Sequence, residues 1–333
     1  MKKLIILILL SLFLSPTVSA DLSKAGSCGA QFLKIGIGSR YQAMGEASVA
    51  VANDIYATYW NPAGLAEIEN AAVSFTNVNY LLDISLNYVG FARRFEDVGV
   101  FGLSATILTT GDQEITTLEY QEGTGEYYSS TSYTFGMTFA RQLNAQFSFG
   151  ASIKYIGERI HNESAHGFGV DFGTLLYPGL SSLRLGVSIS NMGAEMSFSG
   201  SDLIVSYYDD AGDDAINPVS AALQTNSYDL PMLFRMGAAY DVELTPMAIV
   251  TIAGEIKHPN DNVQQGSVGA EFGFNEMFFL RGGYKINYDE EGLTVGGGLD
   301  TRVSKSTRLL IDYAWQDFGR LESTQRFSVG FTF

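Results

Sequence analysis

The chain ends in the stretch QRFSVGFTF, residues 325–333, in which apolar side chains alternate with small or polar ones. Successive side chains of a strand point to opposite faces of its sheet, so this alternation predicts a strand with one apolar face. That face carries Phe327, Val329, Phe331 and Phe333. Such a strand fits the edge of a soluble sandwich or a wall whose outer face lies in lipid, and the rest of the chain decides between them.

Similar alternating segments recur from about residue 69 to the end. They predict fourteen strands, near residues 70–80, 83–96, 98–109, 130–142, 145–158, 165–177, 182–191, 230–242, 246–257, 264–275, 277–288, 292–302, 306–316 and 323–333. A tilted strand needs about 9–11 residues to cross a hydrocarbon layer of ~30 Å, whereas soluble strands usually have about 5–6. The segment lengths therefore favour a transmembrane barrel.

The connections between these segments alternate in length. The third, fifth and seventh are long, whereas the even ones are short, such as EDV at 96–98 and NE at 275–276. Short turns at one end and long loops at the other are typical of outer-membrane barrels. A barrel of this kind abolishes free edges by pairing its last strand with its first. The fold class that we predict is therefore all-β: a 14-stranded antiparallel transmembrane β-barrel.

The final residues add an expectation about assembly. A strand ending in Phe331 and Phe333 resembles the carboxy-terminal recognition strand of outer-membrane proteins, which the barrel-assembly machinery handles. We therefore expect these two side chains to act as an assembly signal.

One face of nearly every predicted strand is apolar, and the other carries glycine, serine and charges of both signs. In a barrel the apolar faces contact lipid and the charged faces line the lumen. Tyr80, Tyr288 and Trp315, near strand ends, fit an interfacial aromatic girdle. The side chains that alternation places in the lumen are Lys154, Asp171, Arg184, Arg235, Glu255, Glu271, Arg281, Lys285, Asp300, Arg302 and Asp312. We expect them to form ion pairs, because unpaired buried charges are costly; the alternative is a polar permeation path.

The first twenty residues, MKKLIILILLSLFLSPTVSA, have the three parts of a secretory signal. Lys2 and Lys3 precede an apolar run that is too short for the ~20 residues of a membrane helix, and Val18–Ala20 form a small-residue cleavage site. The predicted divisions are a signal peptide at 1–20, an amino-terminal plug at 21–68 and the barrel at 69–333. We expect the bacterial outer membrane as the location, with both termini in the periplasm.

The charge balance excludes one class of partner. The chain has 36 acidic and 20 basic residues, a formal net charge of −16. Nucleic-acid binding requires a basic face, so we expect no nucleic acid as a partner. The single cysteine, Cys28, excludes an internal disulfide.

Residues 29–69, GAQFLKIGIGSRYQAMGEASVAVANDIYATYWNPAGLAEIE, do not alternate. Glycines interrupt the segment, and Asn53-Asp54 is a cap for a short helix running to Trp60. Asn61-Pro62 then ends that helix, because proline disfavours the helical conformation of the residue before it. We expect a compact plug with short helices inside the barrel.

The motifs of this segment carry a family resemblance. Phe32–Gly36, Ala43–Gly45 and Tyr59–Leu65 resemble the amino-terminal segment of the PorV/PorQ family of outer-membrane proteins. That family is related to the FadL long-chain fatty-acid transporters, which share the Asn-Pro-Ala-Gly turn found here at Asn61, Pro62, Ala63 and Gly64. Glu46 departs from the family pattern, in which a second glycine often follows Met-Gly. We expect Glu46 either to pair with the lumen wall or to face water.

The resemblance implies a fourteen-stranded barrel with an amino-terminal hatch. We expect no enzymatic activity and no cofactor. In PorV-like members the resemblance implies a role in type IX secretion, in which the barrel receives the carboxy-terminal signal domain of a secreted protein. FadL-like members instead pass hydrophobic small molecules. A third hypothesis is a scaffold barrel that transports nothing. The expected partners are outer-membrane lipid, the barrel-assembly machinery and secreted proteins or other secretion components.

Aromatic residues in the third and seventh connections are the candidates for binding a partner or ligand. They are Tyr120, Tyr127, Tyr128, Phe198, Tyr207 and Tyr208. Exposed aromatic side chains suit a protein partner or a greasy ligand. The alternative is that they pack on one another and cap the barrel.

Other motifs give weaker evidence for metal binding or catalysis. His161, Glu163 and His166 in HNESAH lack a standard zinc spacing, so we expect no metal there. The acidic run Asp209–Asp214 leaves calcium binding open, because it lacks the standard calcium-loop register. No Gly-x-Ser-x-Gly elbow occurs, in keeping with a protein that is not an enzyme.

Overall fold

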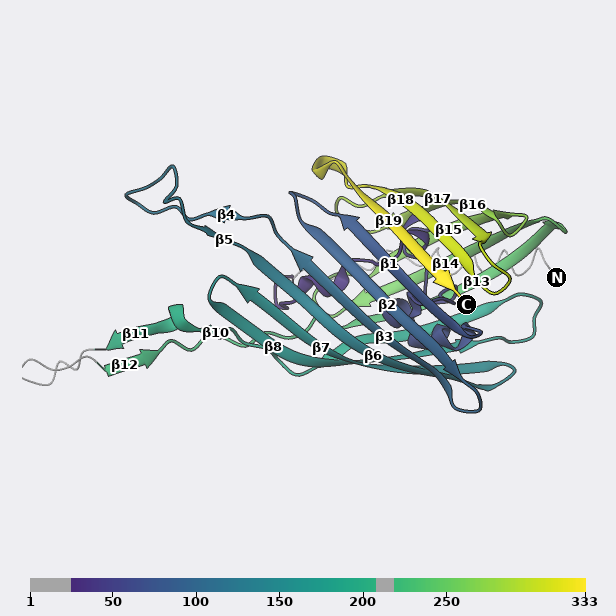
Figure 1. Ribbon diagram of the computed structural model, residues 1–333, viewed down its shortest axis with the longest axis horizontal. Coiled ribbons are helices and arrows are strands. Elements are labelled where there is room, and N and C mark those ends of the chain that lie inside the picture. Colours follow the sequence, from purple (N-terminus) through teal and green to yellow (C-terminus); the bar gives the residue numbers. More distant parts are fainter. Residues whose placement is uncertain (1–24, 208–218) are drawn as a thin grey trace, which may run out of the picture.

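A closed antiparallel barrel dominates the computed structural model, which describes residues 25–207 and 219–333 (Figure 1). The predicted signal peptide, Tyr208 and the acidic run Asp209–Asp214 lie outside the described residues. The strands of the barrel are β1 Ala71–Asn79, β2 Ser85–Phe95, β3 Gly99–Thr109, β6 Ser130–Asn144, β7 Phe147–Ile160, β8 Glu163–Leu176, β9 Arg184–Gly193, β13 Leu233–Thr245, β14 Ala248–Pro259, β15 Gln265–Phe274, β16 Phe278–Ile286, β17 Leu293–Arg302, β18 Arg308–Asp317 and β19 Ser323–Thr332. These are the fourteen predicted strands, and the predicted fold class is confirmed.

The barrel closes between its first and last strands. β1 pairs with β19 from Ala72 opposite Thr332 to Asn79 opposite Gln325. The Phe333 amide extends the ladder by donating to the Ala71 carbonyl at 2.9 Å. Closure gives every strand two neighbours, as a wall in lipid requires, because lipid offers no partner to an unpaired peptide group.

The two faces of the wall differ as the alternation predicts. Large apolar side chains point outward along the strands, and Leu280 on β16 is 67% exposed. Its neighbour Arg281 points inward and is buried. Among the described residues, no helix is long and apolar enough to span a membrane.

Two of the three aromatic residues assigned to a girdle face inward instead. Tyr80 packs edge-on against Phe318 with ring centroids 5.7 Å apart. Tyr288 lies beside the buried ammonium groups of Lys257 and Lys285. The prediction was wrong for Tyr80 and Tyr288 because both follow the last paired residue of their strands, where the alternation no longer holds.

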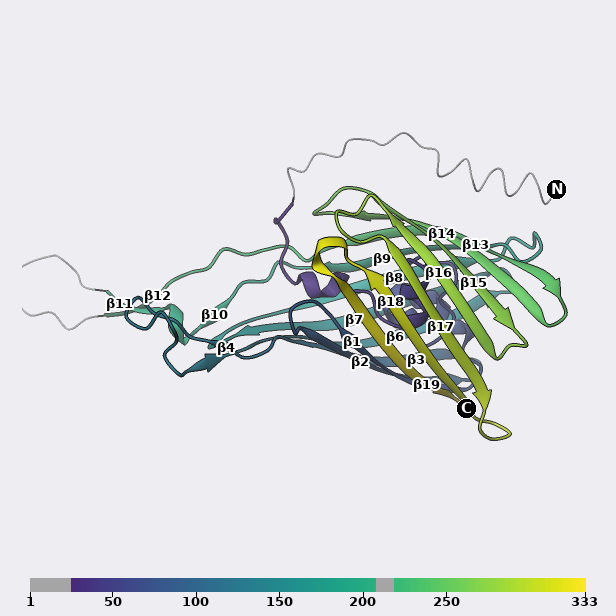
Figure 2. The same ribbon diagram turned by 90° about the horizontal axis from the view of Figure 1, so that it is seen from above.

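Short strands occupy the long connections, where the sequence predicts only loops. β4 and β5 form one hairpin in the third connection, and β11 and β12 form another in the seventh. Both hairpins extend beyond the barrel wall (Figures 1 and 2). The elements of these connections and of the last one are β4 Gln113–Glu114, β5 Tyr127–Tyr128, β10 Ser199–Gly200, η4 Ser201–Leu203, β11 Ile204–Tyr207, β12 Val219–Ala222 and η5 Gly319–Leu321. Runs of two to four residues are too short for alternation to reveal.

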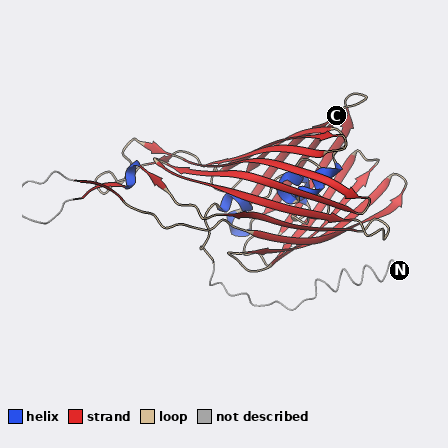
Figure 3. Ribbon diagram, turned by 90° about the horizontal axis from the view of Figure 1, so that it is seen from below, coloured by secondary structure: helices blue, strands red, loops and turns tan. Residues whose placement is uncertain are grey.

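A chain of short helices fills the lumen (Figure 3). These are η2 Gln31–Lys34, α2 Ser39–Ala43, α3 Ala57–Trp60 and η3 Pro62–Glu67. Asp54 caps the turn before α3 by accepting from the Tyr56 amide at 2.9 Å, close to the predicted helix start. η3 packs against β6–β8, whereas α2 packs against β16–β18 on the opposite wall. The core of the molecule is therefore the plug itself, centred on the fully buried Trp60.

The plug runs through the barrel from one mouth to the other. Cys28 pairs with Asp229 at the end that carries the long loops, called here the long-loop end. The plug leaves at the opposite, short-turn end, where Arg94 donates to the Ile68 carbonyl at 2.7 Å. Phe333 lies at the short-turn end, because it pairs with Ala71. The amino terminus itself lies outside the described residues, so the expectation that both termini are periplasmic stays a prediction.

The outer face of β19 provides a test of the lipid-facing assignment. We expect Phe327→Arg, at the middle of the strand, to destabilise the barrel by about 2–4 kcal/mol, because a charge at the bilayer midplane must be desolvated. Gln325→Arg, on the same face nearer the long-loop end, should cost only about 0–1 kcal/mol. Urea unfolding of both variants in lipid vesicles measures the difference. Equal costs would contradict the assignment.

Candidate functional site

The Asn-Pro-Ala-Gly turn attaches the plug to the barrel wall. The buried Asn61 amide donates to the Val49 carbonyl at 2.7 Å within the plug and to the Thr174 carbonyl of β8 at 3.1 Å. Its side-chain oxygen accepts from the Ala63 amide at 3.2 Å and so caps η3. Pro62 begins η3, where its missing N–H costs nothing. A single asparagine thus joins two parts of the plug to the wall.

Gly64 is required by close packing. A Cβ at this position would overlap the carbonyl oxygen of Ala52, and one at the facing wall position Gly173 would overlap the Asn61 side chain. The glycines let the plug backbone lie directly on the wall. The structure therefore brings Asn61, Pro62, Ala63 and Gly64 together as one anchoring turn.

Glu46 forms the polar anchor on the other side of the plug. Its carboxylate lies 2.6 Å from the Lys285 ammonium of β16 and 3.5 Å from that of Lys257 on β14. The Glu46 residue is buried. Of the two expectations for Glu46, the structure shows the ion pair with the wall.

The two lysines determine the ionisation of Glu46. Burial raises the pKa of the Glu46 carboxyl, but Lys285 and Lys257 outweigh burial and lower the pKa from 4.5 to about 2. A carboxylate stabilised in this way holds the plug above pH 4.5 and loses its contribution as the pH falls towards 2. Electrostatic pairing therefore fixes the plug at neutral pH.

Most of the predicted lumen charges have ion-pair partners. The pairs are Lys154–Asp171, Arg184–Asp241, Arg235–Glu255, Glu271–Arg281, Arg281–Asp312, Lys285–Glu46 and Asp300–Arg308. Arg302 has no ion-pair partner among the residues that the structure describes. Arg40 of the plug joins the network by contacting Glu271 at 2.9 Å. Alternation did not reveal Arg40, because the plug has no periodicity that would orient its side chains.

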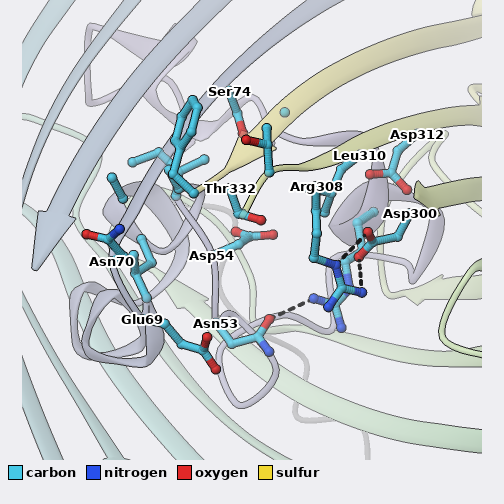
Figure 4. A pocket seen from close by; sticks show the side chains of 18 of the residues that line it. Asn53, Asp54, Glu69, Asn70, Ser74, Asp300, Arg308, Leu310, Asp312 and Thr332 are labelled. Atoms are coloured by element: carbon cyan, nitrogen blue, oxygen red, sulfur yellow. Dashed lines mark hydrogen bonds and ion pairs between the residues drawn. The ribbon is translucent and has the colours of Figure 1, made fainter. Parts of the chain in front are cut away.

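A polar cavity of about 700 Å³ lies at the short-turn end (Figure 4). The Asp300–Arg308 ion pair forms one side, and Asn53, Asp54 and Glu69 lie on the other. Charges of both signs line it in similar number, including the unpaired Arg302. This cavity is a polar vestibule at the short-turn mouth, and its lining has no excess of one charge.

The candidate loop residues lie at the long-loop end. Tyr120, Tyr127, Tyr128 and Tyr207 are exposed on the two hairpins. Phe198 instead packs against Tyr228 with ring centroids 5.9 Å apart. The alternative of mutual packing therefore describes Phe198 alone among the described candidates.

The histidines of the HNESAH segment contact separate neighbours. His161 lies 3.7 Å from Asp202, and the His166 ring stacks on Tyr155. Within residues 25–207 and 219–333, no three potential ligands come together as a metal site.

Comparison with known proteins now identifies the family. A family model described as type IX secretion system protein PorV matches residues 19–259, more than two thirds of the chain. The chain belongs to the PorV family. No protein of curated function matches this PorV-family chain in sequence.

Solved structures of FadL-like barrels share the fold. The toluene transporter TodX of Pseudomonas putida superimposes with a TM-score of 0.59 at 15% identity, covering 89% of this chain and 98% of that chain. A FadL homologue of Pseudomonas aeruginosa gives 0.53 at 12% identity, with 89% and 98% covered. The Ralstonia pickettii toluene transporter TbuX gives 0.52 at 12%, with 89% and 97% covered. At such identities the likeness shows the fold alone, and family and fold together define an outer-membrane β-barrel.

The close packing of the anchoring turn is testable. We expect Gly64→Ala to destabilise the plug by about 1–3 kcal/mol, because the added methyl group must displace the Ala52 carbonyl. Proteolysis of residues 29–68 in the folded barrel should become faster. Gly111→Ala is the matched control, because a Cβ there meets no atom within 4 Å. Equal protease resistance in both variants would refute the role of Gly64.

The pairing of Glu46 predicts a pH dependence. We expect Glu46→Gln to lower the free energy of unfolding by about 3 kcal/mol at neutral pH, because it leaves buried lysine charges without their partner. The difference from wild type should shrink between pH 4.5 and about 2, where Glu46 becomes protonated. Thermal unfolding followed by circular dichroism measures this, with the exposed Glu69→Gln as control. A difference that stays constant with pH would contradict the ion pair as the cause.

Proposed function

We propose that this protein serves type IX secretion as a non-enzymatic barrel whose hairpins bind the carboxy-terminal signal domains of secreted proteins. The family to which it belongs supports the secretion pathway. The observation that carries the binding site is the apolar face of the β11–β12 hairpin, which stands clear of the barrel (Figures 1 and 2).

The register of the hairpin places Val205, Tyr207, Val219 and Ala221 on one face, whereas the other face carries Ser206 and Ser220 together with Ile204 and Ala222. Tyr207 lies opposite Val219, and Val205 lies opposite Ala221. Tyr207 is 59% exposed and Val219 is 62% exposed. Water-exposed apolar faces are costly for an isolated protein and are typical of binding surfaces. We infer that a partner covers this face.

The backbone of the hairpin adds a second means of binding. β11 and β12 pair only with each other among the described strands, so each presents a free edge. A free edge accepts a strand from another protein through main-chain hydrogen bonds. Tyr127 on the β4–β5 hairpin, at the same end of the barrel, is likewise 60% exposed. A folded domain rich in strands fits this combination better than a small molecule does.

The lumen gives less support to the alternative, a FadL-like channel for hydrophobic molecules. An apolar cavity beside the plug, lined by Phe32, Tyr59 and Tyr88, has a volume of only about 20 Å³. A cavity that binds benzene has a volume of about 150 Å³. Transport of a hydrophobic molecule past these residues would therefore require the plug to move. A scaffold barrel remains the third hypothesis, and it predicts a partner without a signal domain.

The hairpin face provides the test. We expect a tagged barrel, isolated from its native host in gentle detergent, to retain secreted proteins that share a carboxy-terminal domain. Tyr207→Ser with Val219→Ser should lower their recovery at least about tenfold, because it removes the two most exposed apolar side chains of this face. Ser206→Ala with Ser220→Ala, on the opposite face of the same strands, is the matched control.

The alternatives give distinct results in the same experiment. Recovery of the barrel with lipids or fatty acids, and without secreted proteins, would favour the hydrophobic channel. Recovery of a partner without the shared domain would favour the scaffold. Equal recovery of secreted proteins by both double variants would move the binding site away from this hairpin.

A further inference from the structure

A second polar cavity lies at the long-loop end, above the plug. It has a volume of about 240 Å³ and lies between the start of the plug and the inner faces of β13, β14 and β19. Tyr80 and Phe318, from two connections at this end, form part of its wall. The volume is several times the ~30 Å³ that one water occupies, so the cavity has room for a small organic molecule.

The carboxylates around this cavity already have partners. Asp261 accepts from Lys34 at 2.9 Å. Glu46 pairs with Lys285 at 2.6 Å, and Glu291 contacts the same Lys285 ammonium. Three acidic groups are thus held chiefly by two lysines.

Two buried cations are paired more weakly: one shares its carboxylate with another lysine, and the other has no carboxylate within ion-pair distance among the described residues. Lys257, which is 7% exposed, has Glu46 as its nearest carboxylate among the described residues, at 3.5 Å. Arg326, which is 2% exposed, donates only to neutral oxygens: the Gly36 carbonyl at 3.3 Å, Gln316 at 3.0 Å and Thr324 at 3.1 Å. Both side chains line the cavity.

The local balance leaves one positive charge. Lys34, Lys257 and Arg326 line the cavity together with Glu46 and Glu291. Lys285 and Asp261 lie behind this lining, where Lys285 pairs with Glu46 and Glu291 and Asp261 pairs with Lys34. The adjacent Arg235 and Glu255 pair with each other at 3.4 Å and leave the net charge around the cavity unchanged. A buried charge without a counter-charge costs several kcal/mol. An anion in the cavity would remove that cost in a chain that is otherwise strongly acidic.

The hydroxyl of Tyr288 adds a directed donor. It is buried, lines the cavity and has no hydrogen-bond partner within the described part of the chain. The Lys257 ammonium lies over the face of the Tyr288 ring, 4.8 Å from its centre, and both residues line the cavity. A cation and a hydroxyl that border one cavity form a donor set that suits an oxyanion.

We propose that this cavity binds a small soluble oxyanion, a carboxylate or a phosphate, through Lys257, Arg326 and the Tyr288 hydroxyl. The ligand is short, because the apolar cavity that also borders the plug segment Phe32–Ile37 holds only about 20 Å³ and has no room for an acyl chain. Lipid headgroups lie outside the barrel wall, so the ligand enters from solution. The site is independent of the hairpin surface and of the proposed secretion role.

Calorimetric titration of the purified full-length barrel tests the proposal. Sodium acetate and sodium phosphate are titrated separately at low chloride, as probes for the two oxyanion classes. We expect saturable one-to-one binding of at least one of them. Lys257→Met and Arg326→Gln should each weaken it at least about tenfold, the effect of losing one charge-assisted hydrogen bond. Lys305→Met, which removes an equal charge at the opposite mouth, should leave the affinity unchanged.

Each outcome of the titrations either identifies the class of anion or overturns the proposal. Binding of acetate alone assigns a carboxylate, binding of phosphate alone assigns a phosphate, and binding of both assigns the site to oxyanions in general. Absence of saturable binding in the wild type, or unchanged affinity in folded Lys257→Met, overturns the proposal. Heat-modifiable mobility on gels reports whether each variant is folded. If the charge variants fail to fold, Tyr288→Phe provides the test. It removes only the hydroxyl and should weaken oxyanion binding.

Discussion

The seam between β1 and β19 is the constraint on which the rest of the structure depends. A wall in lipid tolerates no unpaired strand edge, because lipid cannot hydrogen-bond to peptide groups. Pairing from Ala72 to Asn79 with the last strand closes the ring. Closure then sorts the side chains, because every residue must face either lipid or lumen. The apolar outer face and the charged inner face are therefore two results of a single requirement.

The lumen charges in turn determine how the plug is held. Apolar plug side chains such as Trp60 form a core, and η3 packs on β6–β8. On the opposite wall, Arg40 and Glu46 pair with charges of β15 and β16. The plug thus has an apolar attachment on one side and an ionic attachment on the other. The cavities described above lie at the two ends of the ionic side, at the long-loop end near Glu46 and at the short-turn end near Arg40.

The sequence predicted the barrel wall better than the plug inside it or the hairpins beyond it. Alternation located all fourteen strands, because each wall residue has only two directions to face. It failed for Tyr80 and Tyr288, which lie just past strand ends. The partners of Glu46 were also beyond prediction, because Lys285 is 239 positions away and pairing depends on how the plug sits in the closed ring. The hairpins β4–β5 and β11–β12 escaped notice because strands of two to four residues show no period. Tyr127 and Tyr207 were nevertheless named as candidates, because they are aromatic residues in long connections.

The course of the plug restricts the order in which the molecule is assembled. Residues 28–68 run through the lumen from one mouth to the other and continue directly into β1, one of the two strands of the seam. Ion pairs and closely packed glycines hold this segment against the wall on both sides. We therefore expect the ring to form around a plug that is already in place, with β1 joining β19 last. In this order of assembly the plug would act as the template for closure of the barrel.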